Sequence, residues 1–155
     1  MGLDASVHCN CIKEGKARPH PFPELLACDE TGEPTLRSDS EINLKLWLKH
    51  DEWYRDSCPH GGYLAQKHLG NMASVAYVRG FLENHSPGGF PLLLERVVYS
   101  GVHSGDCVAA GDVPLLLSEA RRVQGLTSDP LILQFTNDLV ELAEASIATG
   151  NPIVF

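Results

Sequence analysis

The strongest constraint on the fold is a long helix near the C-terminus, because the sequence marks both its start and its end. Asp129 is a residue type that caps helix N-termini, and Pro130 suits the first helical position, where its missing N–H needs no partner. Gly150 followed by Pro152 is typical of a helix exit. The sequence therefore predicts a helix between these limits, with an apolar face made of Ile132, Phe135, Leu139 and Leu142.

Other segments predict a mixture of helices and strands. Residues 3–12 alternate in part and favour an opening strand, on which Cys9 and Cys11 share one face. The apolar spacing of Ala65, Leu69, Met72 and Ala76 predicts a helix from Tyr63 to about Leu82, with His68 at the edge of its apolar stripe. Asp112 is expected to cap a further helix. These predictions place strands at residues 24–28, 92–99 and 153–155, and helices at residues 50–57 and 113–123.

Residues 38–49 fit two descriptions. Ser38 and Glu41 have the spacing of a capping box, which opens a helix. The apolar residues from Ile42 to Leu48, however, alternate strictly with polar residues and Trp47, which is the period of a strand. We favour the strand.

Length and composition indicate one folded domain. The chain has 155 residues, of which 43% are hydrophobic and 21% charged, as in ordinary globular proteins. The predicted class is α+β, with a small mixed sheet of about four strands packed against three or four helices. We expect a single globular domain over residues 1–155.

The charge and the cysteines point away from several partner classes. The formal charge is −8, which argues against binding to nucleic acid or to an anionic membrane surface. No apolar run reaches the roughly 18 residues of a membrane-spanning helix, and no signal peptide is evident. Five cysteines without an export signal are expected to be reduced thiols in the cytoplasm.

One concentration of cysteine and histidine suggests a metal site. Cys9 and Cys11 form one close pair, and Cys58 and His60 form another. Thiolate and imidazole groups are zinc ligands, and a zinc site needs about four of them. Each pair is one residue closer than the usual C-x₂₋₄-C spacing. The competing interpretation places Cys9 in the core together with Cys28 and Cys107, since free cysteine behaves as a small buried hydrophobe.

Other catalytic signatures are missing. The sequence has no Gly-x-Gly-x-x-Gly, Walker A, His-Glu-x-x-His or Gly-x-Ser-x-Gly motif. Residues 101–106 form a loop after a predicted strand, where His103 is a candidate general base oriented by Asp106. A turn whose polar side chains satisfy their own backbone explains the same residues, and we favour it.

Several segments carry a resemblance. Residues 1–7, the stretch 50–54 that leads to Cys58-Pro59-His60, and Leu69-Gly70-Asn71 resemble a group of small uncharacterised bacterial proteins. The resemblance implies a bacterial, cytoplasmic origin. It implies no particular chemistry, because that group has no assigned activity.

Three functions follow as expectations. The first is a non-enzymatic protein that binds a protein partner or regulates it. The second is a metal-dependent enzyme, for example a hydrolase, with Cys58 and His60 as zinc ligands and with His103 and Asp106 in proton transfer. In the third, the same ligands hold a structural metal in a binding protein.

Overall fold

A computed structural model describes residues 2–37 and 44–155. Its contacts divide the chain into two compact units, and each is described by itself. The core unit comprises Met1–Val7 and Ala65–Phe155, and the insert unit comprises His8–Leu64. The prediction of one domain over residues 1–155 stays a prediction, because these contacts do not establish whether the units fold cooperatively.

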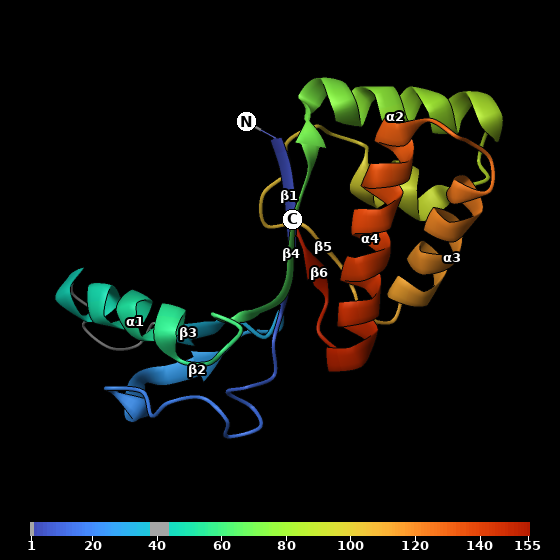
Figure 1. The fold of residues 1–155 in the computed structure, drawn as a ribbon. Coiled ribbons are helices and arrows are strands. Elements are labelled where there is room, and N and C mark those ends of the chain that lie inside the picture. The colour runs from blue at the N-terminus through green and yellow to red at the C-terminus, as the bar shows by residue number, and fades with distance from the viewer. Residues whose placement is uncertain (1, 38–43) are drawn as a thin grey trace. The chain divides into compact units, whose positions relative to one another are not determined.

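The core unit is built on a four-stranded antiparallel sheet (Figure 1). Ser6 pairs with Val154, and Val108 pairs with Ile153. The first and last segments of the chain therefore meet in the sheet, and the predicted terminal strand is confirmed. In spatial order the strands are β4 (Tyr63–Asn71), β1 (Gly2–His8), β6 (Ile153–Val154) and β5 (Cys107–Val108).

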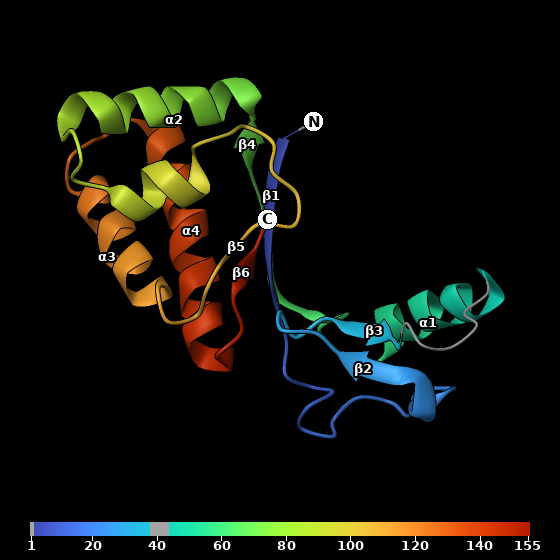
Figure 2. The ribbon, with the colours of Figure 1, turned by 180° about the vertical axis from the view of Figure 1, so that it is seen from behind.

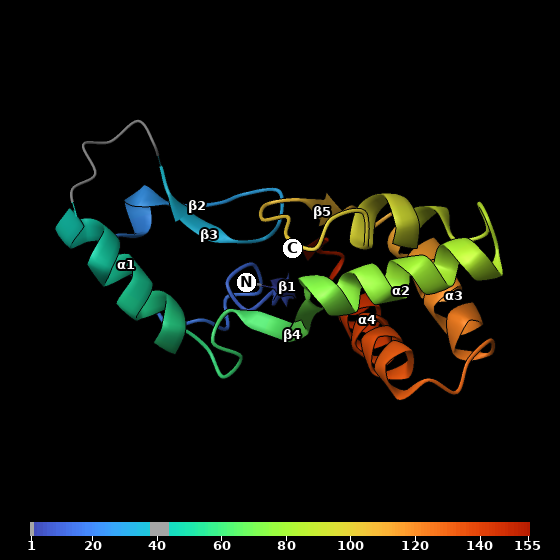
Figure 3. The same cartoon turned by 90° about the horizontal axis from the view of Figure 1, so that it is seen from above.

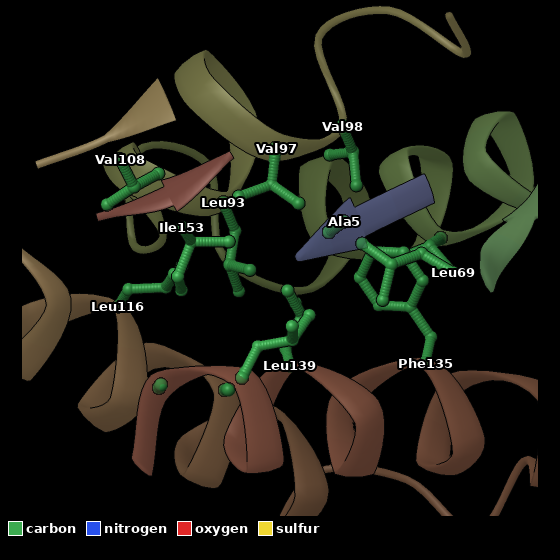
Figure 4. Close-up of a cluster of buried hydrophobic side chains, with 14 of the residues drawn as sticks. Ala5, Leu69, Leu93, Val97, Val98, Val108, Leu116, Phe135, Leu139 and Ile153 are labelled. Atoms are coloured by element: carbon green, nitrogen blue, oxygen red, sulfur yellow. The ribbon is translucent and has the colours of Figure 1, made fainter. Parts of the chain in front are cut away.

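Helices complete the core unit. The helix α2 crosses near the first turn of α4, where the Tyr77 hydroxyl donates to Asp129 over 2.8 Å (Figure 3). Side chains from β1, β6 and α4 point toward one another, among them Ala5, Ile153 and Leu139 (Figure 4). The helical elements are α2 (Met72–His85), the π-helical turn η2 (Leu93–Val97), α3 (Val113–Gln124) and α4 (Pro130–Thr149).

The insert unit pairs a short hairpin with one helix (Figure 2). Leu26 lies opposite Leu36, and Cys28 lies opposite Pro34. Helix α1 contacts the second strand of the hairpin. The elements are η1 (Pro23–Leu25), β2 (Leu26–Cys28), β3 (Pro34–Leu36) and α1 (Leu44–Asp56).

The α+β class with about four sheet strands is confirmed, as are the two C-terminal helices, but the sheet is antiparallel and not mixed. The Asp129 carboxylate accepts from the N–H groups of Leu131 and Ile132, and Gly150 ends α4 in the left-handed conformation. Asp112 precedes α3, but its side chain makes no capping hydrogen bond.

The predicted helix over residues 63–82 is wrong in its first half. Residues 63–71 form β4, and α2 begins only after Asn71, whose side chain accepts from the Ser74 N–H. Ala65 and Leu69 misled the prediction because a spacing of four fits a helical turn and also keeps one face of a strand.

The predicted strand at residues 92–99 is also wrong. This aliphatic segment contains η2 instead. The buried Glu119 carboxylate accepts from the N–H groups of Leu92 and Leu93, at 3.3 and 2.9 Å. A distant acid therefore satisfies the donors at the start of this turn, which local pattern does not reveal.

The preference for a strand over residues 38–49 is corrected from Leu44 onward, where α1 begins. Leu44 and Leu48 are 74% and 59% exposed, so the alternating residues do not define a buried face. His50, Trp53 and Tyr54 follow helical spacing on the more buried side. The proposed Ser38–Glu41 capping box lies outside the described residues.

None of the helices in the described ranges is long and apolar enough to span a membrane.

Candidate metal centre

Four side chains of the insert unit bring their donor atoms together. The Sγ atoms of Cys9, Cys11 and Cys58 and a ring nitrogen of His60 all lie within 4.8 Å of one another. Cys9 Sγ lies 3.7 Å from Cys58 Sγ, and Cys11 Sγ lies 3.2 Å from His60 Nδ1. Tetrahedral zinc, with bonds of about 2.3 Å to sulfur and about 2.0 Å to nitrogen, separates two sulfurs by about 3.8 Å and sulfur from nitrogen by about 3.5 Å. These residues therefore fit a zinc ion after small side-chain adjustments.

A turn directly after β1 positions the first ligand pair. The Cys9 N–H donates to the Gly62 carbonyl over 3.0 Å, which holds this turn beside the segment that carries the second pair. The Cys11 carbonyl accepts from the N–H groups of Lys16 and Ala17, at 2.8 and 3.1 Å. Cys9 and Cys11 thus lie in a turn and not on the predicted strand, although both thiols reach the same cluster.

The second ligand pair lies between α1 and β4. The Gly61 N–H donates to the Cys58 carbonyl over 3.1 Å, so the chain turns tightly between Cys58 and His60. Gly62 has φ +91°, and a Cβ there would overlap the Tyr54 ring. Only glycine allows this close approach without strain.

Burial controls the acidity of the thiols. All three cysteines are free thiols, and Cys9 and Cys11 are buried. Burial raises the pKa of Cys9 to about 12 and also raises the pKa of Cys11. At Cys58, burial raises the pKa, but hydrogen bonds to the Gly62 and His60 backbone and to the other thiols outweigh it and lower the pKa. A divalent cation bound here would favour the thiolate at each position.

A chain of buried histidine hydrogen bonds lies in the same unit, and sequence reasoning missed it. The Phe22 N–H donates to His20 Nδ1 over 3.0 Å, so His20 Nε2 carries the proton that it donates to His50 Nδ1 over 3.1 Å. His50 Nε2 then donates to the Pro34 carbonyl over 3.1 Å. Burial lowers the pKa of His20. No motif in the sequence signals this pairing of residues 30 positions apart.

The candidate catalytic residues His103 and Asp106 belong to the core unit and form no part of the metal cluster. His103 is buried and donates from Nε2 to the Val97 carbonyl over 2.9 Å. Its Nδ1 has no hydrogen-bond partner among the described residues and lies 3.6 Å from Asp106 Oδ2, which accepts from the Tyr99 hydroxyl. Their role in proton transfer stays a prediction.

Three other predictions about histidine and cysteine are wrong. Cys28 and Cys107 are exposed and do not belong to a core. His68 lies on β4 and not on a helix, and its exposed ring lies 2.7 Å from an Asp4 carboxylate oxygen. Residue type misled the prediction for the two cysteines, and a four-residue spacing that also fits one face of a strand misled it for His68.

Comparison of the chain with protein-family models, curated proteins and solved structures finds no match. The resemblance to small bacterial proteins therefore stays a prediction.

Proposed function

We propose that this protein is a non-enzymatic interaction or regulatory protein whose insert unit is stabilised by a structural zinc ion. The observation that carries the proposal is the convergence of four protein donor atoms, from Cys9, Cys11, Cys58 and His60, within 4.8 Å. Four protein ligands complete a tetrahedral zinc site, whereas catalytic zinc keeps one position for water or substrate.

The composition of the insert unit supports a structural role for the metal. Among its described residues, Leu36 and the ring of Pro34 are the buried aliphatic side chains. Its other buried side chains are thiols, imidazoles and a hydroxyl, at Cys9, Cys11, His8, His20, His50 and Ser57. Units below about 70–80 residues seldom gain enough stability from a small core, and a metal is a common remedy.

A metal-dependent hydrolase is the second candidate, and the exposure of His60 favours it. An exposed imidazole exchanges with water more readily than a buried thiolate does. If His60 left the ion, the three cysteines would hold a zinc ion with one open position.

The expected compartment follows from the proposed metal site, and the expected partner class follows from the net charge. Reduced thiols are needed to bind zinc, so a reducing compartment such as the cytoplasm suits the protein. The proposed partner is another protein, in keeping with the net charge of −8, which disfavours nucleic acid.

The experiment is elemental analysis of the tag-free protein after gel filtration, paired with a thiol titration under native conditions. We expect one zinc ion per chain and three protected thiols. Cys9→Ser and Cys58→Ser should each lose the zinc, whereas Cys28→Ser, at an exposed cysteine outside the cluster, should keep it. A chain without metal whose five thiols all titrate would refute the site.

Cobalt substitution separates the two candidates. A four-ligand structural site should give the same tetrahedral cobalt spectrum with and without small anions such as azide. A spectrum that changes with azide would indicate an open position and favour the hydrolase.

A further inference from the structure

A surface pocket of the insert unit gathers positive charge in an acidic chain. Its volume is about 670 Å³, within the range of about 300–1,000 Å³ typical of small-molecule sites. Three cationic side chains and one carboxylate line it, whereas the whole chain has a formal charge of −8. The lining residues are Lys16, Arg18, Arg55, Asp56, Ser57, Cys58 and Pro59.

The two arginines of this pocket differ in their ion pairing from arginines of the core unit. Within residues 2–37 and 44–155, neither Arg18 nor Arg55 forms an ion pair, whereas Arg79 and Arg121 each pair with a glutamate. Lys16 is partly neutralised by Glu14, 2.6 Å away. Among the described residues, including the Asp56 carboxylate of the same pocket, no acid forms an ion pair with either guanidinium group.

Hydrogen bonds hold the backbone that carries these arginines. The Arg18 N–H donates to the Ser57 carbonyl over 2.7 Å, and the Trp53 indole N–H donates to the Arg18 carbonyl over 2.9 Å. Arg55 lies in the last turn of α1, where its Nε donates to the Asp51 carbonyl over 3.4 Å. The two arginines are thus carried on backbone segments that are bonded to each other, which reduces the entropy lost on binding.

We propose that this pocket binds a small molecule through an oxoanion group of two or more negative charges. A guanidinium offers paired N–H donors that match the oxygens of phosphate and carboxylate. The lining residues carry two net positive charges, and these are offset by Glu14, which pairs with Lys16, and by a zinc centre with three thiolates, which carries one net negative charge. Selectivity for an oxoanion therefore rests on the N–H donors of Arg18 and Arg55 and not on a net charge of the region. The proposal goes beyond the structural metal and concerns a ligand that the metal does not hold.

The test is an NMR titration of the ¹⁵N-labelled full chain, incubated with zinc and then gel-filtered, at constant ionic strength set with chloride. The probes are inorganic phosphate and succinate, which compete for zinc less than pyrophosphate or citrate does. We expect saturable shifts of the Arg18 and Arg55 side-chain Nε–H signals with at least one probe. Tighter binding of phosphate identifies phosphate esters as the ligand class, and tighter binding of succinate identifies dicarboxylates. Shifts that grow linearly for both probes would overturn the proposal.

A matched pair of variants distinguishes anion binding in the pocket from non-specific attraction of anions to positive charge on the protein. Arg18→Gln should raise Kd about tenfold, the size of one charge-assisted contact. Lys45→Gln removes one charge from an exposed position of α1 outside the pocket and should change Kd less than twofold. Equal effects of the two substitutions would refute the pocket. If Arg18→Gln alters the amide spectrum, Arg55→Gln takes its place.

Zinc content, measured on the same samples, keeps the two proposals separate. Saturable shifts in a chain that holds no zinc would support the anion pocket and refute the metal centre. A zinc-loaded chain without saturable shifts would support the metal centre and refute the anion pocket.

Discussion

The two units of this chain are stabilised by different kinds of interior. The buried hydrophobic cluster of the protein lies entirely in the core unit, where leucine, valine, isoleucine and phenylalanine are almost inaccessible to solvent. The insert unit buries mainly imidazoles and thiols. Apolar burial stabilises a fold without requiring particular bond angles. Metal ligation and hydrogen bonds stabilise it only when their distances and angles are correct. The insert unit should therefore be more sensitive to metal, redox state and pH.

Removal of the metal should give the largest difference in amide protection between the two units. Structural zinc in small domains contributes about 10–16 kcal/mol of apparent binding free energy, most of which is coupled to folding. We expect a zinc chelator to make the amides of residues 9–62 exchange rapidly while α3 and α4 stay protected. Hydrogen exchange with mass spectrometry measures both units in one sample. Unchanged exchange in the insert unit would mean that the ligands do not stabilise it.

A cavity in the hydrophobic cluster should destabilise the core unit and leave the metal centre of the insert unit unchanged. Leu139 is fully buried on α4, and Leu139→Ala should lower the free energy of unfolding of the core unit by about 2–5 kcal/mol. Ile147→Ala, on the same helix at a side chain 52% exposed, should cost under about 0.5 kcal/mol. Denaturant titration measures both, and zinc content should stay at one ion per chain. Loss of zinc in Leu139→Ala would show that the interiors are coupled.

Removing a helix cap should have a smaller effect, again on the core unit. The Asn71 side chain accepts from the Ser74 N–H over 2.9 Å at the start of α2. Asn71→Ala should cost about 1 kcal/mol, because that donor loses its partner. Asn84→Ala, near the other end of α2, is the matched control and should be close to neutral in thermal unfolding. Equal losses in the two variants would assign the effect to helix composition instead of capping.

Mild acid should give the smallest change in stability, and we expect it in the insert unit. Burial lowers the pKa of His20, with the neighbouring His50 as a smaller contribution. Below about pH 6.5 the unfolded chain therefore binds more protons at His20 than the folded state does. The free energy of unfolding is highest above this pH and decreases as the pH falls below it.

The wild type should therefore lose thermal stability more steeply than His20→Gln between about pH 7.5 and about pH 5.5. Both proteins keep the same metal ligands, so acid release of zinc affects them alike. Identical slopes would show that the buried histidine pair does not respond to protons.

Local signals were sufficient for part of the fold. The cap, proline and glycine that delimit α4 act within a few residues of the helix, so they can be read directly. The segment at 93–97 depends on Glu119, more than twenty residues away, and pattern alone misassigned it. The sequence identified all four metal-ligand candidates by residue type. It did not reveal that they converge, because Cys9 and Cys58 are 49 positions apart.

The strand order β4-β1 has a consequence for the architecture of the chain. The insert unit leaves the sheet at the end of β1 and returns at the start of β4, its immediate neighbour. The Cys9 N–H donates to the Gly62 carbonyl directly after β1 and directly before β4 in sequence, and one ligand pair follows or precedes each of these strands within a few residues. In topological terms the insert occupies the position of a hairpin loop. Adjacent antiparallel strands need as few as two residues to connect them, so the sheet does not depend on the insert for its connectivity. By strand connectivity alone, a turn of two residues between β1 and β4 would be sufficient to join them.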